Sequence, residues 1–283
     1  MIADDPLTHD ARPELLVTPE ALAAELRASH SGNAPLLLDV RPAHAFAEGH
    51  LPGAVHVDLW GVSLIDTDPA PLRAFLWMIH HVLESRGVTG GRPVVVCDQQ
   101  SGLRAARAFW FLEYFGHERV RLLDGGVDAW GRGGFTLTTE CVVPVGSEWP
   151  AHDTPSILAT WTDVRDRLDG LAVMLDTRTD EEYAGTLVRA RRGGTIPGSV
   201  HLEWTRNLDA SGAFKPVAAL RDMYLAAGVT PDREVVTYCQ GAYRAAHSYL
   251  ALRLLGYPRV RVYLGSWKEW GDREDTPVEI PRG

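Results

Sequence analysis

The sequence predicts an α/β protein of two domains with like folds, each a mostly parallel sheet with helices on both faces. Three observations lead to this prediction. The chain of 283 residues is long for one typical domain and comfortable as two. Blocks of sequence recur in the same order in both halves, and short apolar segments alternate with helical stretches within each half.

The internal repeat divides the chain into two units. Residues 36–41 (LLLDVR) recur as 173–178 (VMLDTR), residues 49–56 (GHLPGAVH) recur as 194–201 (GTIPGSVH), and residues 116–130 recur as 256–270. Glycines and prolines interrupt the stretch between residues 131 and 155, which is typical of a connecting segment. The predicted domains are therefore residues 1–140 and 155–283, joined by a linker at 141–154.

The same order of elements is expected in both halves. In the first half we expect strands at 36–40, 94–97 and 120–123 and helices at 42–48 and 104–115. In the second half we expect strands at 172–176, 235–238 and 261–264 and helices at 180–183 and 245–255. Ligand sites of such folds lie beyond the carboxyl ends of the strands, which directs attention to the residues after 238.

Composition excludes several classes of protein. The net charge of −9 and the pI near 5.6 argue against a general basic surface for nucleic acids. The three cysteines are an odd number without metal-ligand spacing, and His80 and His81 show no partners at such spacing. The chain has no apolar run of membrane length, and its first twenty residues do not resemble a signal peptide. We expect a cytoplasmic monomer with no cofactor, metal, membrane or nucleic-acid partner.

The most informative residue is Cys239. It follows the strand at 235–238 and faces the N-terminus of the next helix across a short loop that ends at Arg244. Unpaired amides and the helix dipole in such a place favour a thiolate, which is a nucleophile. The alternative is a buried apolar cysteine at a strand end, and the local pattern alone does not separate the two.

The two halves differ at this position. Aligning the strands puts Asp98 opposite Cys239, and the loop from Asp98 to Arg104 is one residue longer than the loop from Cys239 to Arg244. Cys97 falls one step earlier, where strand alternation turns it toward the core. An aspartate would bring negative charge to a place meant for an anion, so we expect one active site, in the second half.

These features resemble tandem-domain rhodaneses, a sulfurtransferase family, over essentially the whole chain. The matching motifs are LDVR at 38–41, GHLPGA at 49–54, LDTR at 175–178, IPGSV at 196–200, the loop at 239–244, and GSW at 265–267 with Trp270. The resemblance implies that Cys239 accepts a sulfane sulfur as a persulfide and passes it to cyanide or a thiol. It also assigns the loop residues Gln240, Gly241, Ala242 and Tyr243 to the binding of a small anionic sulfur donor.

Physical chemistry agrees with these assignments. Amides from Gln240 to Arg244 would point inward and stabilise an anionic sulfur, and Gly241 would allow the backbone curvature. Arg244 would supply fixed positive charge for the donor's anionic end. Related phosphatases carry this arginine six residues after the cysteine. Here the step is five residues, so we expect a cradle sized for one sulfur atom, and phosphatase activity is a poor second.

The donor is a finer question. Mercaptopyruvate-specific relatives typically have a Cys-Gly-Ser/Thr-Gly-Val-Thr loop, and they carry an arginine where this chain has Glu182. The loop CQGAYR and Glu182 look more like bacterial thiosulfate sulfurtransferases, so thiosulfate is the favoured donor. The alternatives are a 3-mercaptopyruvate sulfurtransferase, or a persulfide carrier that delivers sulfur to a protein partner. No motif identifies the acceptor.

Further residues have two possible roles each. The segment from Arg189 to Arg192 could place cations at the cleft, with Arg189 the candidate, or form a solvated surface loop. Trp204 could wall the pocket or simply pack. Asp39 and Asp176, each followed by an arginine two residues later, are interpreted as structural. Trp267 and Trp270 are expected in the core, and His247 is expected on a helix face.

Overall fold

The computed structural model describes residues 10–29 and 34–281. It contains two five-stranded sheets, with strand orders β1-β5-β4-β2-β3 and β6-β10-β9-β7-β8, and every strand pair in them is parallel. The two orders are the same when strands are matched by their place in each half. The predicted fold class, two similar α/β domains, is confirmed.

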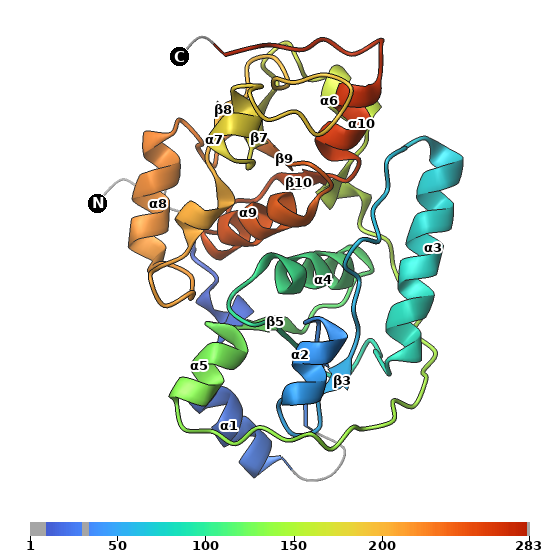
Figure 1. Cartoon of the computed structure of the whole chain (residues 1–283), viewed down its shortest axis with the longest axis vertical. Coiled ribbons are helices and arrows are strands. Elements are labelled where there is room, and N and C mark those ends of the chain that lie inside the picture. Colours follow the sequence, from blue (N-terminus) through green and yellow to red (C-terminus); the bar gives the residue numbers. More distant parts are fainter. Residues whose placement is uncertain (1–9, 30–33, 282–283) are drawn as a thin grey trace, which may run out of the picture.

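The first half supplies the lower part of the molecule in Figure 1. Its strands are β1 (Leu16–Val17), β2 (Leu36–Asp39), β3 (Val55–His56), β4 (Val94–Cys97) and β5 (Val120–Leu123). Its helices are η1 (Pro13–Leu15), α1 (Pro19–Ala28), α2 (Ala43–Glu48), α3 (Pro69–Ser85), α4 (Leu103–Tyr114) and α5 (Gly126–Arg132).

The second half repeats this order. Its strands are β6 (Leu158–Ala159), β7 (Ala172–Asp176), β8 (Val200–His201), β9 (Glu234–Tyr238) and β10 (Val260–Tyr263). Its helices are η2 (Pro155–Ile157), α6 (Trp161–Arg165), α7 (Asp180–Tyr183), η3 (Trp204–Asn207), α8 (Val217–Ala226), α9 (Tyr243–Leu254) and α10 (Ser266–Asp272). The predicted strands and helices occur within two residues of their expected ends.

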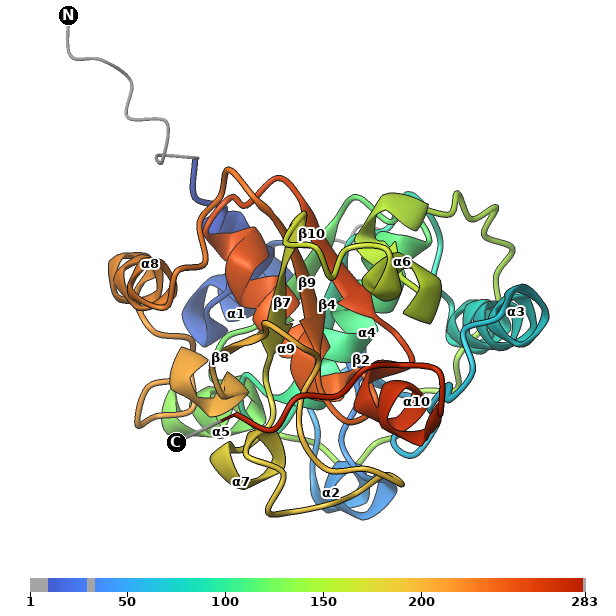
Figure 2. The same cartoon turned by 90° about the horizontal axis from the view of Figure 1, so that it is seen from above.

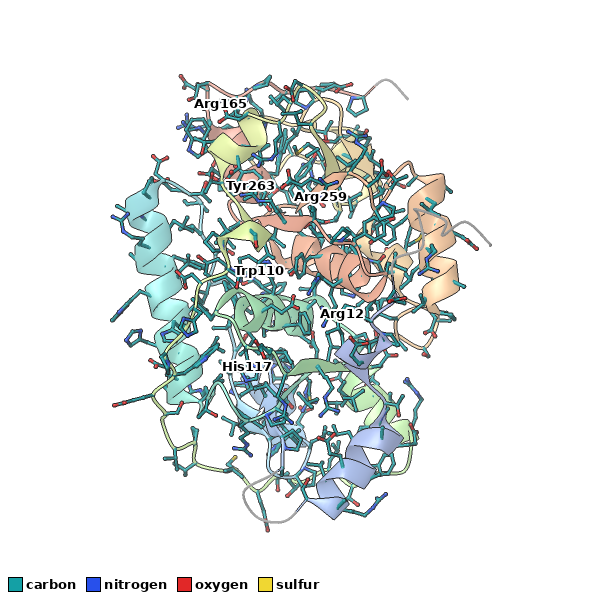
Figure 3. The ribbon with its side chains drawn as sticks, turned by 180° about the vertical axis from the view of Figure 1, so that it is seen from behind. Arg12, Trp110, His117, Arg165, Arg259 and Tyr263 are labelled. Carbon is teal, nitrogen blue, oxygen red and sulfur yellow. The ribbon has the colours of Figure 1, made fainter. Side chains whose placement is uncertain are left out.

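Helices α4 and α9 lie side by side between the two sheets (Figures 1 and 2). The largest hydrophobic cluster runs through this layer and includes residues of both halves, for example Phe109 and Leu250. Trp110 of α4, whose side chain is buried, lies at the same boundary (Figure 3) and donates its indole N–H to the Ile157 carbonyl. The halves therefore share a core, and groups of one half can reach a site in the other.

A second contact joins the halves at helix α10. The segment before α3 brings Thr67 to the buried carboxylate of Glu269 in α10, which accepts hydrogen bonds from the Thr67 amide and hydroxyl at 2.6 and 2.8 Å. The Trp161 amide donates to the Thr67 hydroxyl at 2.9 Å.

Within residues 10–29 and 34–281, no helix combines the length and apolar composition needed to cross a bilayer.

Candidate active site

Cys239 lies where the sequence predicts it, directly after β9 and before the N-terminus of α9. Its side chain is buried at a pocket of about 410 Å³. Both halves line this pocket. The first half contributes Trp60, Gly61, Ser63 and Leu103, and the second half contributes Arg189, Cys239, Gln240, Gly241, Tyr243 and Arg244.

The loop after Cys239 is held by hydrogen bonds to the start of helix α10. The Ser266 hydroxyl accepts hydrogen bonds from the amides of Cys239 at 3.2 Å and Ala242 at 3.1 Å, and it donates to the Tyr263 carbonyl at 2.9 Å. The carbonyls of Cys239 and Gln240 accept from the first amides that follow Ser266 in α10. Sequence reasoning did not identify this role of Ser266, although the residue stands in one of the repeated motifs.

The backbone turn of the loop is made at Ala242, with φ of 66°. The expectation that Gly241 provides the curvature is wrong, because Gly241 is not among the residues with positive φ. A Cβ atom on Gly241 would meet the Ser63 hydroxyl at an ordinary 3.4 Å. The Ala242 amide is directed to Ser266 and not into the cradle. Among the described residues, the amides of Gln240, Gly241, Tyr243 and Arg244 form no hydrogen bond and are available to an anion.

Arg244 is held by Glu182, which sits on α7 and is buried. The guanidinium Nη2 donates to Glu182 Oε1 at 3.0 Å, and Nη1 makes a shorter contact with Oε2. Burial alone would raise the pKa of Glu182, but the hydrogen bonds and charge of Arg244 lower it below the usual range. Glu182 is therefore ionised and offsets the positive charge of Arg244 while it fixes the orientation of the guanidinium.

The segment at 189–192 is divided between two roles. Arg189 lines the pocket, its side chain is 55% exposed, and its backbone carbonyl accepts a hydrogen bond from the side-chain Nε2 of Gln240 at 3.0 Å. Arg192 instead donates to the carbonyls of Trp270 and Thr276 at 2.9 and 2.7 Å, so it anchors the segment. Arg191 pairs with the exposed Glu274.

Trp204 and His247 are not part of the lining of the Cys239 pocket. Trp204 is not among the residues that line the Cys239 pocket, and its ring packs edge-on against His247 at 4.9 Å. His247 is not a surface residue of its helix. It is fully buried, its Nε2 lies 2.8 Å from the Ser101 carbonyl of the first half, and burial lowers its pKa to about 4.

The first half has a carboxylate where the second half has the thiol. In the sheet, Cys97 pairs with Asp39 and Tyr238 pairs with Asp176, so the next residues, Asp98 and Cys239, occupy equivalent places. Asp98 accepts hydrogen bonds from the amides of its own loop and helix N-terminus, at 2.8 Å from Gln99, 3.2 Å from Arg104 and 3.4 Å from Ala105. The Asp98 carboxylate therefore occupies the place that the first-half loop would otherwise offer to an anion.

The neighbouring Cys97 is packed away from that edge. It belongs to the cluster between the first sheet and helices α1 and α5, and burial raises its pKa well above the usual value, with Asp39 adding to the effect. The third cysteine, Cys141, is exposed. Cys239, by contrast, lines the pocket that both halves form.

The residues interpreted as structural behave as expected. Asp39 and Asp176 are fully buried, and each binds the arginine two residues later. The Arg178 Nη2 also donates to the Gly194 carbonyl at 2.7 Å, so the pair ties two loops together. Trp267 and Trp270 are buried in the core.

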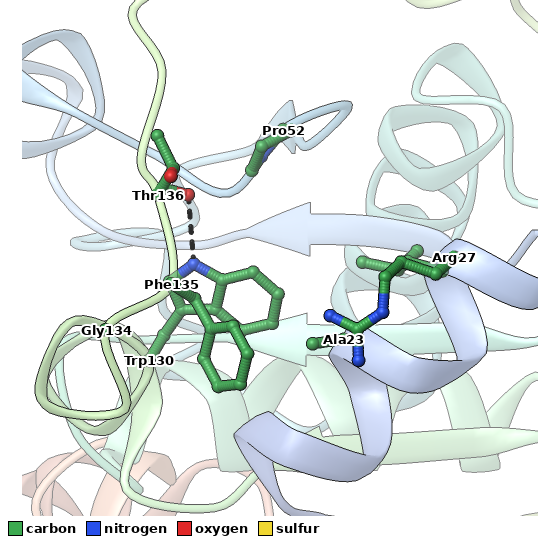
Figure 4. A pocket seen from close by; sticks show the side chains of 8 residues that line it. Ala23, Arg27, Pro52, Trp130, Gly134, Phe135 and Thr136 are labelled. Carbon is green, nitrogen blue, oxygen red and sulfur yellow. Dashed lines mark hydrogen bonds between the residues drawn. The ribbon is translucent and has the colours of Figure 1, made fainter.

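A pocket of the first half lies apart from Cys239 and has a different lining. A pocket of about 570 Å³ is lined by Ala23, Leu26, Arg27, Pro52, Trp130, Gly134, Phe135 and Thr136 (Figure 4), and no thiol or carboxylate is among them. The expectation that His80 and His81 lack a third ligand is wrong, because Glu84 brings its carboxylate to them on α3, with all three ligand atoms within 4.8 Å. The cluster of His80, His81 and Glu84 is partly exposed and lies outside the Cys239 pocket.

Comparison with known proteins gives a consistent result. The sequence pattern of the rhodanese-like domain matches residues 22–132 and 160–273. The thiosulfate sulfurtransferases of Pseudomonas aeruginosa and Azotobacter vinelandii are both 39% identical, over 94% and 91% of this chain and 97% and 95% of their own lengths. The sulfur carrier protein TtuD of Thermus thermophilus is 35% identical over 81% of this chain and 85% of its own.

A solved structure shares the fold at lower identity. The anaerobic ergothioneine biosynthesis enzyme from Chlorobium limicola superimposes with a TM-score of 0.83, at 21% identity, over 96% of this chain and 71% of that chain.

Proposed function

The chain belongs to the rhodanese family and carries two of its domains, and from this we propose that it is a thiosulfate sulfurtransferase working through a Cys239 persulfide. One observation carries the assignment to Cys239. The second-half loop surrounds a thiol with free amides and Arg244, where the first-half loop already holds the Asp98 carboxylate. A cradle that binds a carboxylate in one copy can bind an anionic sulfur in the other.

The reaction takes two displacements. The Cys239 thiolate attacks the outer sulfur of thiosulfate, the sulfur–sulfur bond of the donor breaks, and sulfite leaves with its electron pair. Free amides of the loop stabilise the resulting persulfide anion. A thiophilic acceptor, cyanide or a thiol, then attacks the terminal sulfur of the persulfide. The sulfur–sulfur bond of the persulfide breaks, and its electron pair stays on Cys239, which returns to the thiolate.

Glu182 supports thiosulfate as the donor. The carboxylate already engages both terminal nitrogens of Arg244, so this guanidinium is not free to bind the carboxylate of a donor such as 3-mercaptopyruvate. Arg189 supplies a further exposed cation at the mouth. The alternative donor, 3-mercaptopyruvate, would need its carboxylate to reach Arg189 or to displace Glu182 from Arg244.

A persulfide carrier is the second candidate, favoured by the 35% identity to the sulfur carrier TtuD. In that case the acceptor is a protein thiol and cyanide turnover is incidental. We also propose that the protein is a monomer of the reducing cytoplasm. Its proposed domains are residues 1–140 and 155–283, joined by a linker at 141–154. The free state of all three cysteines supports the reducing compartment.

Steady-state kinetics with thiosulfate and 3-mercaptopyruvate side by side test the donor. A preference for mercaptopyruvate above about tenfold in kcat/KM, ~1.4 kcal/mol, would reverse the assignment. Cys239→Ser should abolish transfer and the +32 Da adduct in intact mass, whereas the exposed Cys141→Ser should keep both. Full activity in Cys239→Ser would end the proposal. Faster discharge to a protein acceptor than to cyanide would favour the carrier.

A further inference from the structure

Arg107 is a buried cation that the mechanism above does not use. It lies on α4 in the half that lacks the catalytic thiol, and its exposed fraction is 2%. None of its three guanidinium nitrogens has a hydrogen-bond partner among the described residues. An unpaired buried guanidinium is costly, and an apolar side chain of similar size would avoid the cost. The position therefore calls for a reason other than packing.

The guanidinium faces the active loop of the other half. Its Cζ lies 3.9 Å from the centre of the Tyr243 ring, and the Phe111 ring is at 5.2 Å. Tyr243 lines the Cys239 pocket, and its hydroxyl donates to the Leu59 carbonyl at 2.7 Å. Arg107 therefore makes a cation–π contact with the Tyr243 ring, although Arg107 itself does not line the pocket.

The charges around Cys239 show what Arg107 adds. Arg244 and Arg189 share the carboxylate of Glu182, Arg189 at 3.6 Å, so these three groups leave one net positive charge near the pocket mouth. Arg104, one turn before Arg107, is offset by Asp58 at 2.7 Å. For Arg107, burial lowers the pKa to about 10, and the groups that oppose the shift are Tyr243 and Cys239, with no carboxylate among them.

The repeat explains how the first half reaches this place. Arg107 corresponds to His247, since both stand three residues after the arginine that follows the loop. His247 binds the Ser101 carbonyl in the loop of the first half, and Arg107 stacks on Tyr243 in the loop of the second. Each central helix therefore supports the opposite loop.

We propose that Arg107 is a positioning residue of the sulfur-transfer site, which holds Tyr243 and supplies a positive charge without a paired carboxylate for the anionic sulfur on Cys239. This inference rests on the proposed function for its catalytic consequence. Its electrostatic part concerns the thiolate alone and needs no turnover.

Arg107→Met removes the charge and keeps most of the volume. We expect the midpoint of the pH dependence of Cys239 alkylation by iodoacetamide, read by mass spectrometry of the Cys239 peptide, to rise by about one unit. Below both midpoints, kcat/KM for thiosulfate should fall about tenfold, in proportion to the thiolate. The thermal midpoint should not fall, because an unpaired buried charge is removed.

Two further variants separate charge from packing. Arg107→Lys keeps the charge and should restore most of the alkylation shift. Arg121→Met removes a first-half arginine that pairs with Glu25 and should leave the alkylation midpoint unchanged. A midpoint in folded Arg107→Met equal to that of the unmodified chain would overturn the inference, as would an equal shift in Arg121→Met. If Arg107→Met fails to fold, the same comparison is made with Arg107→Gln. Absence of turnover in the unmodified chain would refute the proposed function and leave the alkylation result standing.

Discussion

Ser266→Ala tests whether the loop geometry is set from helix α10. The substitution removes one buried hydroxyl that accepts from two amides, at 3.2 Å from Cys239 and 3.1 Å from Ala242, and donates to the Tyr263 carbonyl. Ser266 has a φ of 53°, and alanine carries the same Cβ there, so the backbone cost of that conformation does not change.

The magnitude follows from the two amides left without an acceptor. Each buried donor that loses its partner costs about 1–3 kcal/mol, less where water or backbone movement compensates. We therefore expect the free energy of unfolding to fall by about 2–4 kcal/mol. Because these amides hold both ends of the loop, kcat/KM for thiosulfate should fall at least about tenfold, equivalent to ~1.4 kcal/mol of transition-state stabilisation.

Urea unfolding and steady-state kinetics at one pH measure both effects. Ser101→Ala is the matched control, because this buried first-half hydroxyl accepts from the Gly125 amide at 2.7 Å and donates to Asp124. It should lose stability and keep kcat/KM within about twofold. A Ser266→Ala protein that is destabilised but fully active would refute the link between Ser266 and the loop. Unchanged stability would refute the hydrogen-bond accounting itself.

The remaining predictions concern charge and pH. Glu182→Gln frees the charge of Arg244, so the midpoint of Cys239 alkylation should fall by about one unit; an unchanged or higher midpoint would contradict the ion-pair argument. His247 has a folded pKa of about 4 against 6.5 when unfolded, so the unfolded state binds the proton first as pH falls. Urea unfolding should show a loss of about 2 kcal/mol between pH 7.5 and 5 that His247→Gln removes, and an identical pH slope in both proteins would speak against a neutral buried imidazole.

The elements that the sequence predicted well are those written twice. Strands β4 and β7 have the predicted bounds, because their apolar runs are buried on both faces and polar residues follow or end them. The equivalence of Asp98 and Cys239 followed from the same repeat, and the strand register bears it out. Helices α3 and α8, which lie between the third and fourth strands of their halves, were not predicted, because their sequences are outside the repeated blocks.

The parts of the site that could not be predicted are contacts between segments distant in sequence. Ser63 approaches Gly241, and Trp60 and Leu103 line the pocket, although nothing in their local sequence indicates it. The left-handed turn at Ala242 was missed because glycine is the usual residue there, and a tertiary contact with Ser266 overrides that preference.

The half without the catalytic thiol has kept a role through its contact surface. Asp98 occupies its own cradle, so that loop is closed to an external anion, yet helix α4 still packs against α9 and presents Arg107 to Tyr243. The repeat makes this exchange reciprocal, because His247 supports the closed loop in the same way. Removing the first half would expose the shared core and take Trp60, Ser63 and Leu103 from the pocket. The catalytic unit of this protein is therefore the pair of domains and not the second domain alone.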